Sequence, residues 1–269
     1  MTAHDDRLIS SDFKTDCLTM PRLEILLLML LVGCASGGAT VRSDSKSSVA
    51  VQNNIQMGRA YLERDQLDMA LEKLSRALEL DPRAVDAHTL IAVLYERIER
   101  VSRAEEHYRR AVELLPESGA ENNNLGQFLC RSGRFEEAQS RFKIAMDDPF
   151  YKTPGLLYMN AGVCAFEAGD LSLAEQHMRK ALQFDATNSR LLLAMAKLAF
   201  KQEQPLKARA FLQRFEEQGV SSPEALQLGA NVEASLGDAE ASARYVEKLR
   251  TEFPDFTPSN AFQGEPETP

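Results

Sequence analysis

The cysteine residues are the side chains in this sequence with the most varied chemistry, and their spacing limits what they do. Cys17, Cys34, Cys130 and Cys164 form no CxxC pair and have no histidine at a zinc-ligand spacing. We therefore predict no metal site. No nucleophile has a matching base, and no glycine-rich phosphate loop follows a strand, so we predict no catalytic residue, no cofactor and no enzyme activity.

Cys34 ends a short apolar segment. From Leu23 to Val32 only Glu24 interrupts the apolar residues, whereas a membrane-spanning helix needs about 20 of them. Arg22 before the segment and small residues after it are typical of a secretory signal. Leu31-Val32-Gly33-Cys34 resembles the bacterial lipobox, which implies that the Cys34 thiol is acylated and the preceding peptide removed. An ordinary cleaved signal and an accidental match are the alternatives.

This interpretation divides the N-terminal region into a signal peptide and an anchored tether. Residues 1–33 are the predicted signal, with translation starting at Met20 as a hypothesis, because residues 1–19 are too polar for its first part. Residues 34–50 are rich in Gly, Ser and charge, so we expect a lipidated cysteine followed by a flexible tether. The residue after Cys34 is Ala35 and not Asp. By analogy with bacterial lipoproteins, this suggests that the protein is transferred to the outer membrane, where it would face the periplasm.

The rest of the chain repeats with a period of about 34 residues. Small residues recur in three columns, large residues follow at constant offsets, and glycines such as Gly133, Gly169 and Gly237 fall midway in their copies. Each repeat is therefore predicted to be a pair of antiparallel helices. The three columns of small residues begin Gly58, Ala92, Gly126, Gly162; then Ala70, Ala104, Ala138, Ala174; then Ala77, Ala111, Ala145, Ala181.

This pattern resembles the tetratricopeptide repeat over residues 51–254. The resemblance implies an all-α fold, a right-handed superhelical solenoid of about six helical hairpins. A tail over residues 255–269 has little to bury, and we expect it to be disordered. The six repeats are predicted at about residues 51–84, 85–118, 119–152, 155–188, 189–222 and 223–254.

Cys130 and Cys164 fall on the first helices of the third and fourth repeats, which are neighbours in a solenoid. In an oxidising periplasm such a pair is expected to form a disulfide, and two buried free thiols are the alternative. The histidines His88, His107 and His177 are expected at the surface or at the edge of a groove, and the last two lie too far apart to share a metal.

First helices line the concave face of such a solenoid, so their side chains at i, i+3, i+7 and i+10 predict a groove that holds a partner protein. The apolar stretch across the fourth and fifth repeats exceeds what a solvated groove needs. A superhelix that curls inward and buries these residues on itself is the alternative. The predicted groove residues are Ile55, Arg59, Leu62, Asn123, Gln127, Leu156, Met159, Val163, Phe166, Leu193, Lys197 and Phe200.

The formal net charge of −9 argues against a nucleic-acid partner, because phosphate contacts need clustered Lys and Arg. The lipobox, the six repeats and three segments together resemble the type IV pilus biogenesis lipoproteins. The resemblance implies a monomeric pilotin that binds pilus secretin subunits, anchors in outer-membrane lipid through Cys34, and promotes secretin localisation and multimerisation. An adaptor of outer-membrane protein assembly or of peptidoglycan remodelling is the alternative. The three segments are Asn123 to Tyr151, "NAGVCAFEAGDLSLAEQHMRKAL" and "LRTEFPDF".

Overall fold

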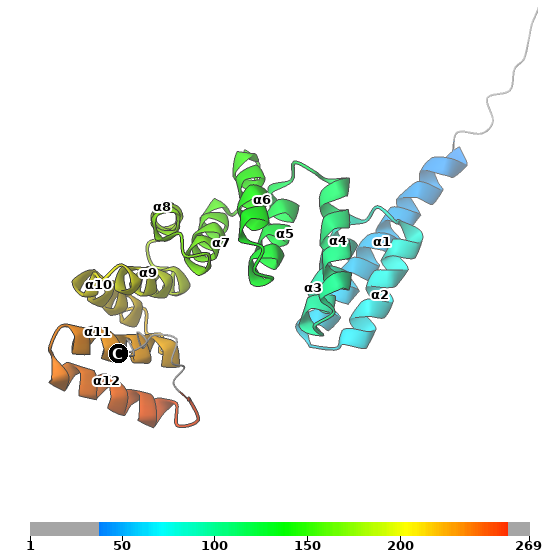
Figure 1. Cartoon of the computed structure of the whole chain (residues 1–269). Coiled ribbons are helices and arrows are strands. Elements are labelled where there is room, and N and C mark those ends of the chain that lie inside the picture. The colour runs from blue at the N-terminus through cyan, green and yellow to red at the C-terminus, as the bar shows by residue number, and fades with distance from the viewer. Residues whose placement is uncertain (1–37, 258–269) are drawn as a thin grey trace, which may run out of the picture. The chain divides into compact units, whose positions relative to one another are not determined.

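The computed structural model describes residues 38–257, with side chains from residue 48 onward, and every regular element in this part of the chain is an α-helix (Figure 1). The chain divides into two units, Met1–Ser43 and Asp44–Pro269, and only the helical residues 38–43 of the first are described. The helices are α1 (Gly38–Glu63), α2 (Leu67–Leu80), α3 (Val85–Arg97), α4 (Val101–Leu114), α5 (Gly119–Arg131), α6 (Phe135–Asp147), α7 (Pro154–Glu167), α8 (Leu171–Leu182), α9 (Ser189–Lys201), α10 (Pro205–Glu216), α11 (Pro223–Ser235) and α12 (Ala239–Glu252).

The small residues of the repeat allow the two helices of a hairpin to approach closely. A Cβ atom added at Gly126 of α5 would lie 2.8 Å from the Phe142 ring on α6. At Gly162 of α7 it would lie 2.7 Å from Met178 Cγ on α8. Such distances are too short for carbon atoms in contact, so only glycine allows these large side chains to pack against the facing backbone.

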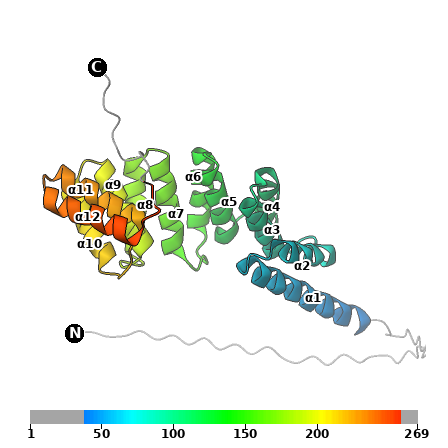
Figure 2. The ribbon, with the colours of Figure 1, turned by 90° about the horizontal axis from the view of Figure 1, so that it is seen from below.

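Within the second unit, consecutive hairpins pack side by side in the order of the sequence (Figure 2). The second helix of each hairpin contacts the first helix of the next, and the first helices α5, α7, α9 and α11 also contact one another in turn. Apolar clusters fill the space between helices, with Leu74, Phe142 and Leu192 almost completely buried. The predicted all-α solenoid of helical hairpins is therefore confirmed.

The turn inside each hairpin holds one residue in the left-handed region, where φ is positive. Gly133, Gly169 and Gly237 occupy this position with φ of 73°, 83° and 80°. The other three hairpins place Asp65, Glu99 and Glu203 there, with φ of 57° to 59°. Glycine adopts this conformation freely, whereas a residue with a Cβ atom is strained in it.

Polar side chains also join neighbouring hairpins. Arg134 reaches Glu105 with an Nη1–Oε1 distance of 2.6 Å. Glu175 on α8 accepts hydrogen bonds from Lys207 and Gln202 at 2.8 and 2.9 Å, and Arg179 adds another. These bonds, the one from Lys207 first, lower the pKa of Glu175 to about 2. The carboxylate is therefore charged at neutral pH and links α8 to the fifth hairpin.

The predicted tether differs from the structure, since α1 already begins at Gly38. The prediction of a flexible segment is wrong for residues 38–50. Extending a helix costs little once packing holds its nucleus, and residues 51–63 supply that nucleus because Val51, Ile55 and Leu62 are buried.

Several predictions fall at the ends of the chain. The signal over residues 1–33, Cys17, Cys34 and the tail from residue 258 lie outside the described residues. Of the predicted tail, residues 255–257 are described; Phe256 is half-buried and its N–H donates to the Phe253 carbonyl at 3.1 Å. Among the described helices, none has the length and apolar character needed to cross a membrane.

Candidate partner-binding site

A pocket of about 400 Å³ lies between the first helices α5, α7 and α9, in the third to fifth hairpins. Side chains of Met159, Val163 and Phe166 on α7 and Leu193 on α9 give it an apolar floor. The other lining residues are Gln127, Cys130, Arg131, Phe142, Asn160, Glu167, Met178, Arg190, Ala194 and Lys197.

Half of the residues predicted to line a groove lie together in this pocket. They come from three successive first helices, which the stacking of the hairpins brings side by side. Val163 is 37% exposed, and Phe166 and Leu193 are half-buried, so apolar surface is open to a partner. The predicted residues that line the pocket are Gln127, Met159, Val163, Phe166, Leu193 and Lys197.

The prediction that Ile55 and Leu62 line a groove is wrong. They are only 3% and 4% exposed and belong to one apolar cluster with Leu90, Ile91 and Leu94 of α3. The large apolar residues of the next hairpin bury these α1 positions in the core. Arg59, on the same helix, is exposed but borders no described pocket.

Three other predicted groove residues lie elsewhere in the described structure. Asn123 is 3% exposed, and its Oδ1 accepts a hydrogen bond from Asn160 Nδ2 at 3.1 Å, so it ties α5 to α7. Leu156 is exposed and borders a separate pocket of about 330 Å³ near Phe184. Phe200 is half-buried against the apolar cluster of the fourth to sixth hairpins.

Cys130 and Arg190 also fall at groove-facing repeat positions, so the sequence did not point to the six remaining pocket residues. Phe142 and Met178 occupy the repeat column of large residues, which are expected to fill the space inside each hairpin. In the structure both side chains also reach the pocket. Asn160, Arg131 and Glu167 fall at repeat positions next to the predicted ones. The sixth is Ala194.

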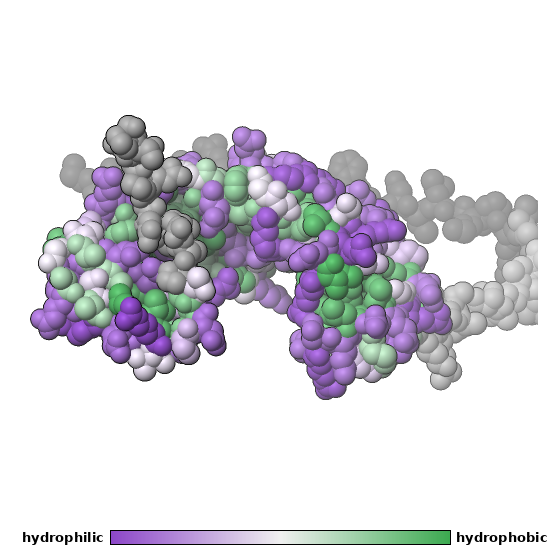
Figure 3. Space-filling model, turned by 60° about the horizontal axis from the view of Figure 1, so that its bottom comes forward, coloured by the Kyte–Doolittle hydropathy of each residue, from purple (hydrophilic) through white to green (hydrophobic). Residues whose placement is uncertain are grey.

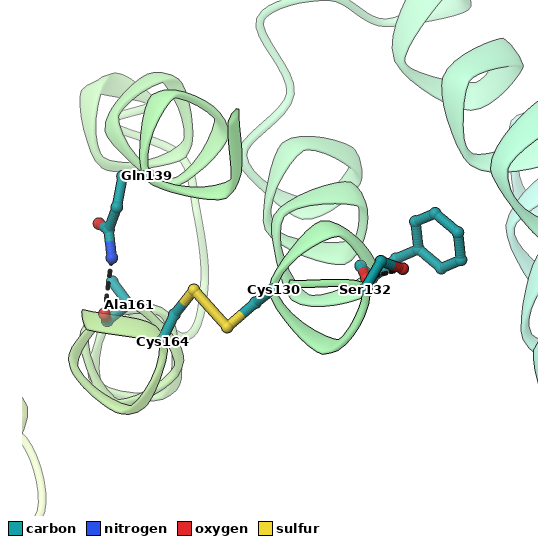
Figure 4. The surroundings of a disulfide bond; sticks show 6 residues. Cys130, Ser132, Gln139, Ala161 and Cys164 are labelled. Carbon is teal, nitrogen blue, oxygen red and sulfur yellow. Dashed lines mark hydrogen bonds between the residues drawn. A yellow bond between two sulfur atoms is a disulfide. The ribbon is translucent and has the colours of Figure 1, made fainter. Parts of the chain in front are cut away.

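The structure pairs Cys130 of α5 with Cys164 of α7 in a disulfide, with the two Cα atoms 5.7 Å apart (Figure 4). Cys130 forms part of the pocket wall, so the covalent link fixes two of the three helices that line the pocket. Gln139 of α6 adds a hydrogen bond to the Ala161 carbonyl at 3.1 Å, close to Cys164 (Figure 4).

Glu96 holds the pocket residue Arg131 from the neighbouring hairpin. Arg131 donates from Nε and Nη2 to the two Glu96 carboxylate oxygens at 2.6 and 2.9 Å, and the Tyr108 hydroxyl donates to Glu96 at 3.1 Å. Burial, followed by the nearby Glu96 charge, raises the pKa of Tyr108. Arg131 is therefore held by an ion pair, whereas the site's other cations, Arg190 and Lys197, have no such partner in the described structure.

The described histidines, which the sequence placed at the surface or at the edge of a groove, are half-buried. His88 and His107 lie across the second hairpin with their Nδ1 atoms 3.0 Å apart, and His88 Nε2 is 3.2 Å from the Pro82 carbonyl. Burial is the largest cause that lowers the pKa of each, and also that of His177. Among the residues from 48 to 257, no three His, Cys, Asp or Glu side chains gather as a metal site would require.

This arrangement of side chains is suited to binding. Apolar residues with a few polar and charged groups at the edge are typical of a pocket that holds part of another molecule. On the face shown in Figure 3, hydrophilic residues predominate and apolar residues gather in smaller patches among them.

Two sequence profiles of the tetratricopeptide repeat match the chain, one over residues 55–119 and 124–189 and the other over residues 165–232. Together they cover more than half of the chain. The type IV pilus assembly protein PilF of Pseudomonas aeruginosa is 29% identical over 245 residues, which are 90% of this chain and 97% of PilF. An uncharacterized protein of Haemophilus influenzae is 27% identical over 60% of this chain and 88% of its own length.

Two solved structures are similar over most of their length. The structure from the functional characterization of Pseudomonas aeruginosa PilF has a TM-score of 0.71 and 28% identity, and the match covers 78% of this chain and 95% of that one. The crystal structure of PilW, described as a widely conserved type IV pilus biogenesis factor, has a TM-score of 0.74 and 27% identity, covering 77% and 94%. The chain is homologous to PilF and PilW.

Proposed function

Because the chain belongs to the tetratricopeptide repeat family, we propose that it is a non-catalytic scaffold of type IV pilus biogenesis that binds the pilus secretin. Homology to PilF over 97% of that protein's length is the observation that carries the proposal. Similarity of this extent includes every hairpin rather than a single shared repeat. It therefore favours a common role over the fold alone, which repeat proteins of many functions share.

The proposed binding site is the pocket between α5, α7 and α9. Burial of its apolar floor by a partner would stabilise the complex by roughly 25 cal/mol for each Å² of apolar surface removed from water. The disulfide and the Asn123–Asn160 hydrogen bond connect α5 to α7 and keep the floor in one shape before a partner arrives. Such pre-organisation reduces the ordering cost of binding.

In this proposal the protein is an outer-membrane lipoprotein, held by acyl chains on Cys34 and acting as a monomer. Two or three chains anchor stably, whereas one binds only marginally. Anchoring confines scaffold and secretin to one surface and so raises their effective concentration. The secretin subunits would then reach the outer membrane and assemble into their ring there.

The test compares secretin assembly in a deletion strain complemented with different versions of the chain. We expect assembled rings to disappear from outer-membrane fractions of the deletion strain and to return with the unchanged gene. Cys34→Ala should leave secretin in the wrong membrane fraction. Normal outer-membrane rings in the uncomplemented strain would exclude the proposed role.

A matched pair of substitutions tests whether the pocket is the binding site. Val163→Asp places a charge on the apolar floor, and Leu206→Asp makes the same kind of change at an apolar α10 residue that is 67% exposed and outside the pocket. Pull-down of secretin from detergent extract should fail for the first variant and succeed for the second. Equal recovery would move the binding site away from this pocket.

A further inference from the structure

We propose that the pocket between α5, α7 and α9 selects an acidic peptide segment, in which carboxylates about 10 Å apart flank an apolar side chain. This inference deepens the proposed function and rests on the pocket being the site of partner binding. It names the chemistry that the pocket recognises, which homology to pilus biogenesis factors does not supply.

The apolar floor of the pocket would bind the apolar side chain of the partner segment. Met159, Val163 and Phe166 lie along one face of α7, and Leu193 of α9 lies beside them. The volume of about 400 Å³ suits a few side chains and not a whole folded domain. A partner segment therefore contributes one or two apolar residues at its centre.

Two cations on α9 are placed to bind the two carboxylates of the partner segment. Arg190 and Lys197 both line the pocket and are seven residues apart, which is close to two full helical turns. They therefore lie on the same face of α9, with about 10 Å between their positions along the helix axis. Three residues of an extended chain span about the same length.

These two cations differ from others nearby because, within residues 48–257, neither forms an ion pair. Arg131, at the opposite side of the pocket, is held by both oxygens of Glu96. On α8, Glu175 forms ion pairs with both Arg179 and Lys207 of α10. Arg190 and Lys197 are thus positive groups that no carboxylate of residues 48–257 pairs with.

The negative charge of the whole chain makes the two unpaired cations a selective site for acidic segments. A formal net charge of −9 disfavours acidic segments over most of the surface, so attraction is concentrated where unpaired cations lie. Glu167, at the end of α7, also lines the pocket and disfavours a carboxylate on that side. The acidic residues of the partner should therefore lie along α9, with the apolar side chain on α7.

The test uses a displayed library of random 12-residue peptides, selected on the purified full-length chain. Selected peptides should be enriched in Asp or Glu three residues apart with an apolar residue between them. Their affinity, measured by fluorescence anisotropy, should fall as salt increases because ion pairs are screened. The double substitution Arg190→Glu with Lys197→Glu should weaken binding at least about tenfold, equivalent to 1.4 kcal/mol.

Lys201→Glu is the matched control, because Lys201 is an exposed cation on the same helix and lies outside the pocket. It should weaken binding much less than the double substitution, because Lys201 lies one helical turn, about 6 Å along the axis, beyond Lys197 and does not line the pocket. Peptides whose acidic residues are changed to lysine should bind the double variant better than the original chain. Circular dichroism and thermal melting check that each variant keeps its fold.

A failure to enrich any peptide, a neutral or basic set of peptides, or an affinity that the double substitution does not change would overturn the inference. Secretin pull-down separates this outcome from failure of the proposed function. If acidic and apolar peptides are enriched but secretin is not captured, the result would support the pocket chemistry and contradict the secretin role. Secretin capture that the double substitution leaves unchanged would contradict the pocket chemistry alone.

Discussion

The first two hairpins, α1 to α4, and the three that form the pocket, α5 to α10, use the same repeat positions in different ways. Ile55 and Leu193 occupy equivalent positions, but Ile55 is buried in the core and Leu193 lines the pocket. The disulfide ties hairpins of the second region only. The hairpin turns differ in part, with Asp65 and Glu99 in the first region and Gly133, Gly169 and Glu203 in the second.

This difference shows that a position in the repeat determines the direction of a side chain but not what it meets. Ile55 is covered because α3 presents Leu90, Ile91 and Leu94 in the same cluster. Around Leu193 the neighbouring α9 residues Arg190 and Lys197 are charged, so no apolar side chain of the next turn covers it as α3 covers Ile55. At this repeat position the first region therefore places a core residue, whereas the second keeps an apolar side chain open to the pocket.

The largest expected effect comes from truncating the equivalent residues of the two regions. Ile55→Ala should lower the free energy of unfolding by about 2–5 kcal/mol, because it opens a cavity in the core. Leu193→Ala should cost about 1 kcal/mol, since its side chain is half solvated. Urea unfolding gives both values, and equal losses would mean that the two positions do not differ in burial.

Hydrogen exchange can also show where the loss occurs. Each hairpin contacts mainly its neighbours, so destabilisation by Ile55→Ala should speed amide exchange in α1 to α4 before α9 to α12. Uniform acceleration throughout the described helices would contradict the division into regions.

Removing the disulfide should have the next largest effect. Cys130→Ser with Cys164→Ser releases a link across 34 residues, for which the stabilisation is typically about 2–4 kcal/mol. Because the link joins α5 and α7, exchange should increase in those helices, and peptide binding to the pocket should weaken. Reduction of the unchanged protein is the control and should reproduce both results. A double variant as stable as the oxidised chain would show that packing alone holds α5 on α7.

The sequence was sufficient to predict the helices, because the three columns of small residues fix both the period and the pairing. It also predicted the cysteine pair, since neighbouring repeats place Cys130 beside Cys164. It could not distinguish Ile55 from Leu193, because burial depends on the side chains that the next hairpin presents. The ion pair between Glu96 and Arg131 was also missed, although the repeat period brings these positions of neighbouring first helices together as it does the two cysteines.

A smaller difference in stability between the two regions should appear as the pH is lowered. Burial lowers the pKa of His88, His107 and His177, so the folded chain binds fewer protons than the unfolded chain. Stability should therefore be complete above the ordinary histidine pKa of 6.5 and decrease as the pH falls below it. Arg110 opposes protonation of His88 and Arg103 that of His107, whereas Glu106 favours both.

The two regions should contribute unequally to this pH dependence. In the first region His88 and His107 also repel each other when charged, whereas in the second region Asp170 favours protonation of His177. His88→Gln with His107→Gln should therefore flatten the curve of stability against pH more than His177→Gln does. Urea unfolding between pH 7.5 and 5 measures the slopes, and a larger change with His177→Gln would contradict the comparison.

The smallest effect should come from exchanging the turn residues of the two regions. Gly133→Ala should lower stability by about 1 kcal/mol, because φ is 73° there and the loss is conformational, with no atom within 4 Å of the added methyl group. Glu99→Gly relieves the same strain at φ of 57°, but glycine also gains freedom in the unfolded chain. The net result should be a gain of less than about 1 kcal/mol, seen as a higher urea midpoint. A loss on Glu99→Gly would mean that the first region's acidic turns contribute contacts beyond the backbone geometry.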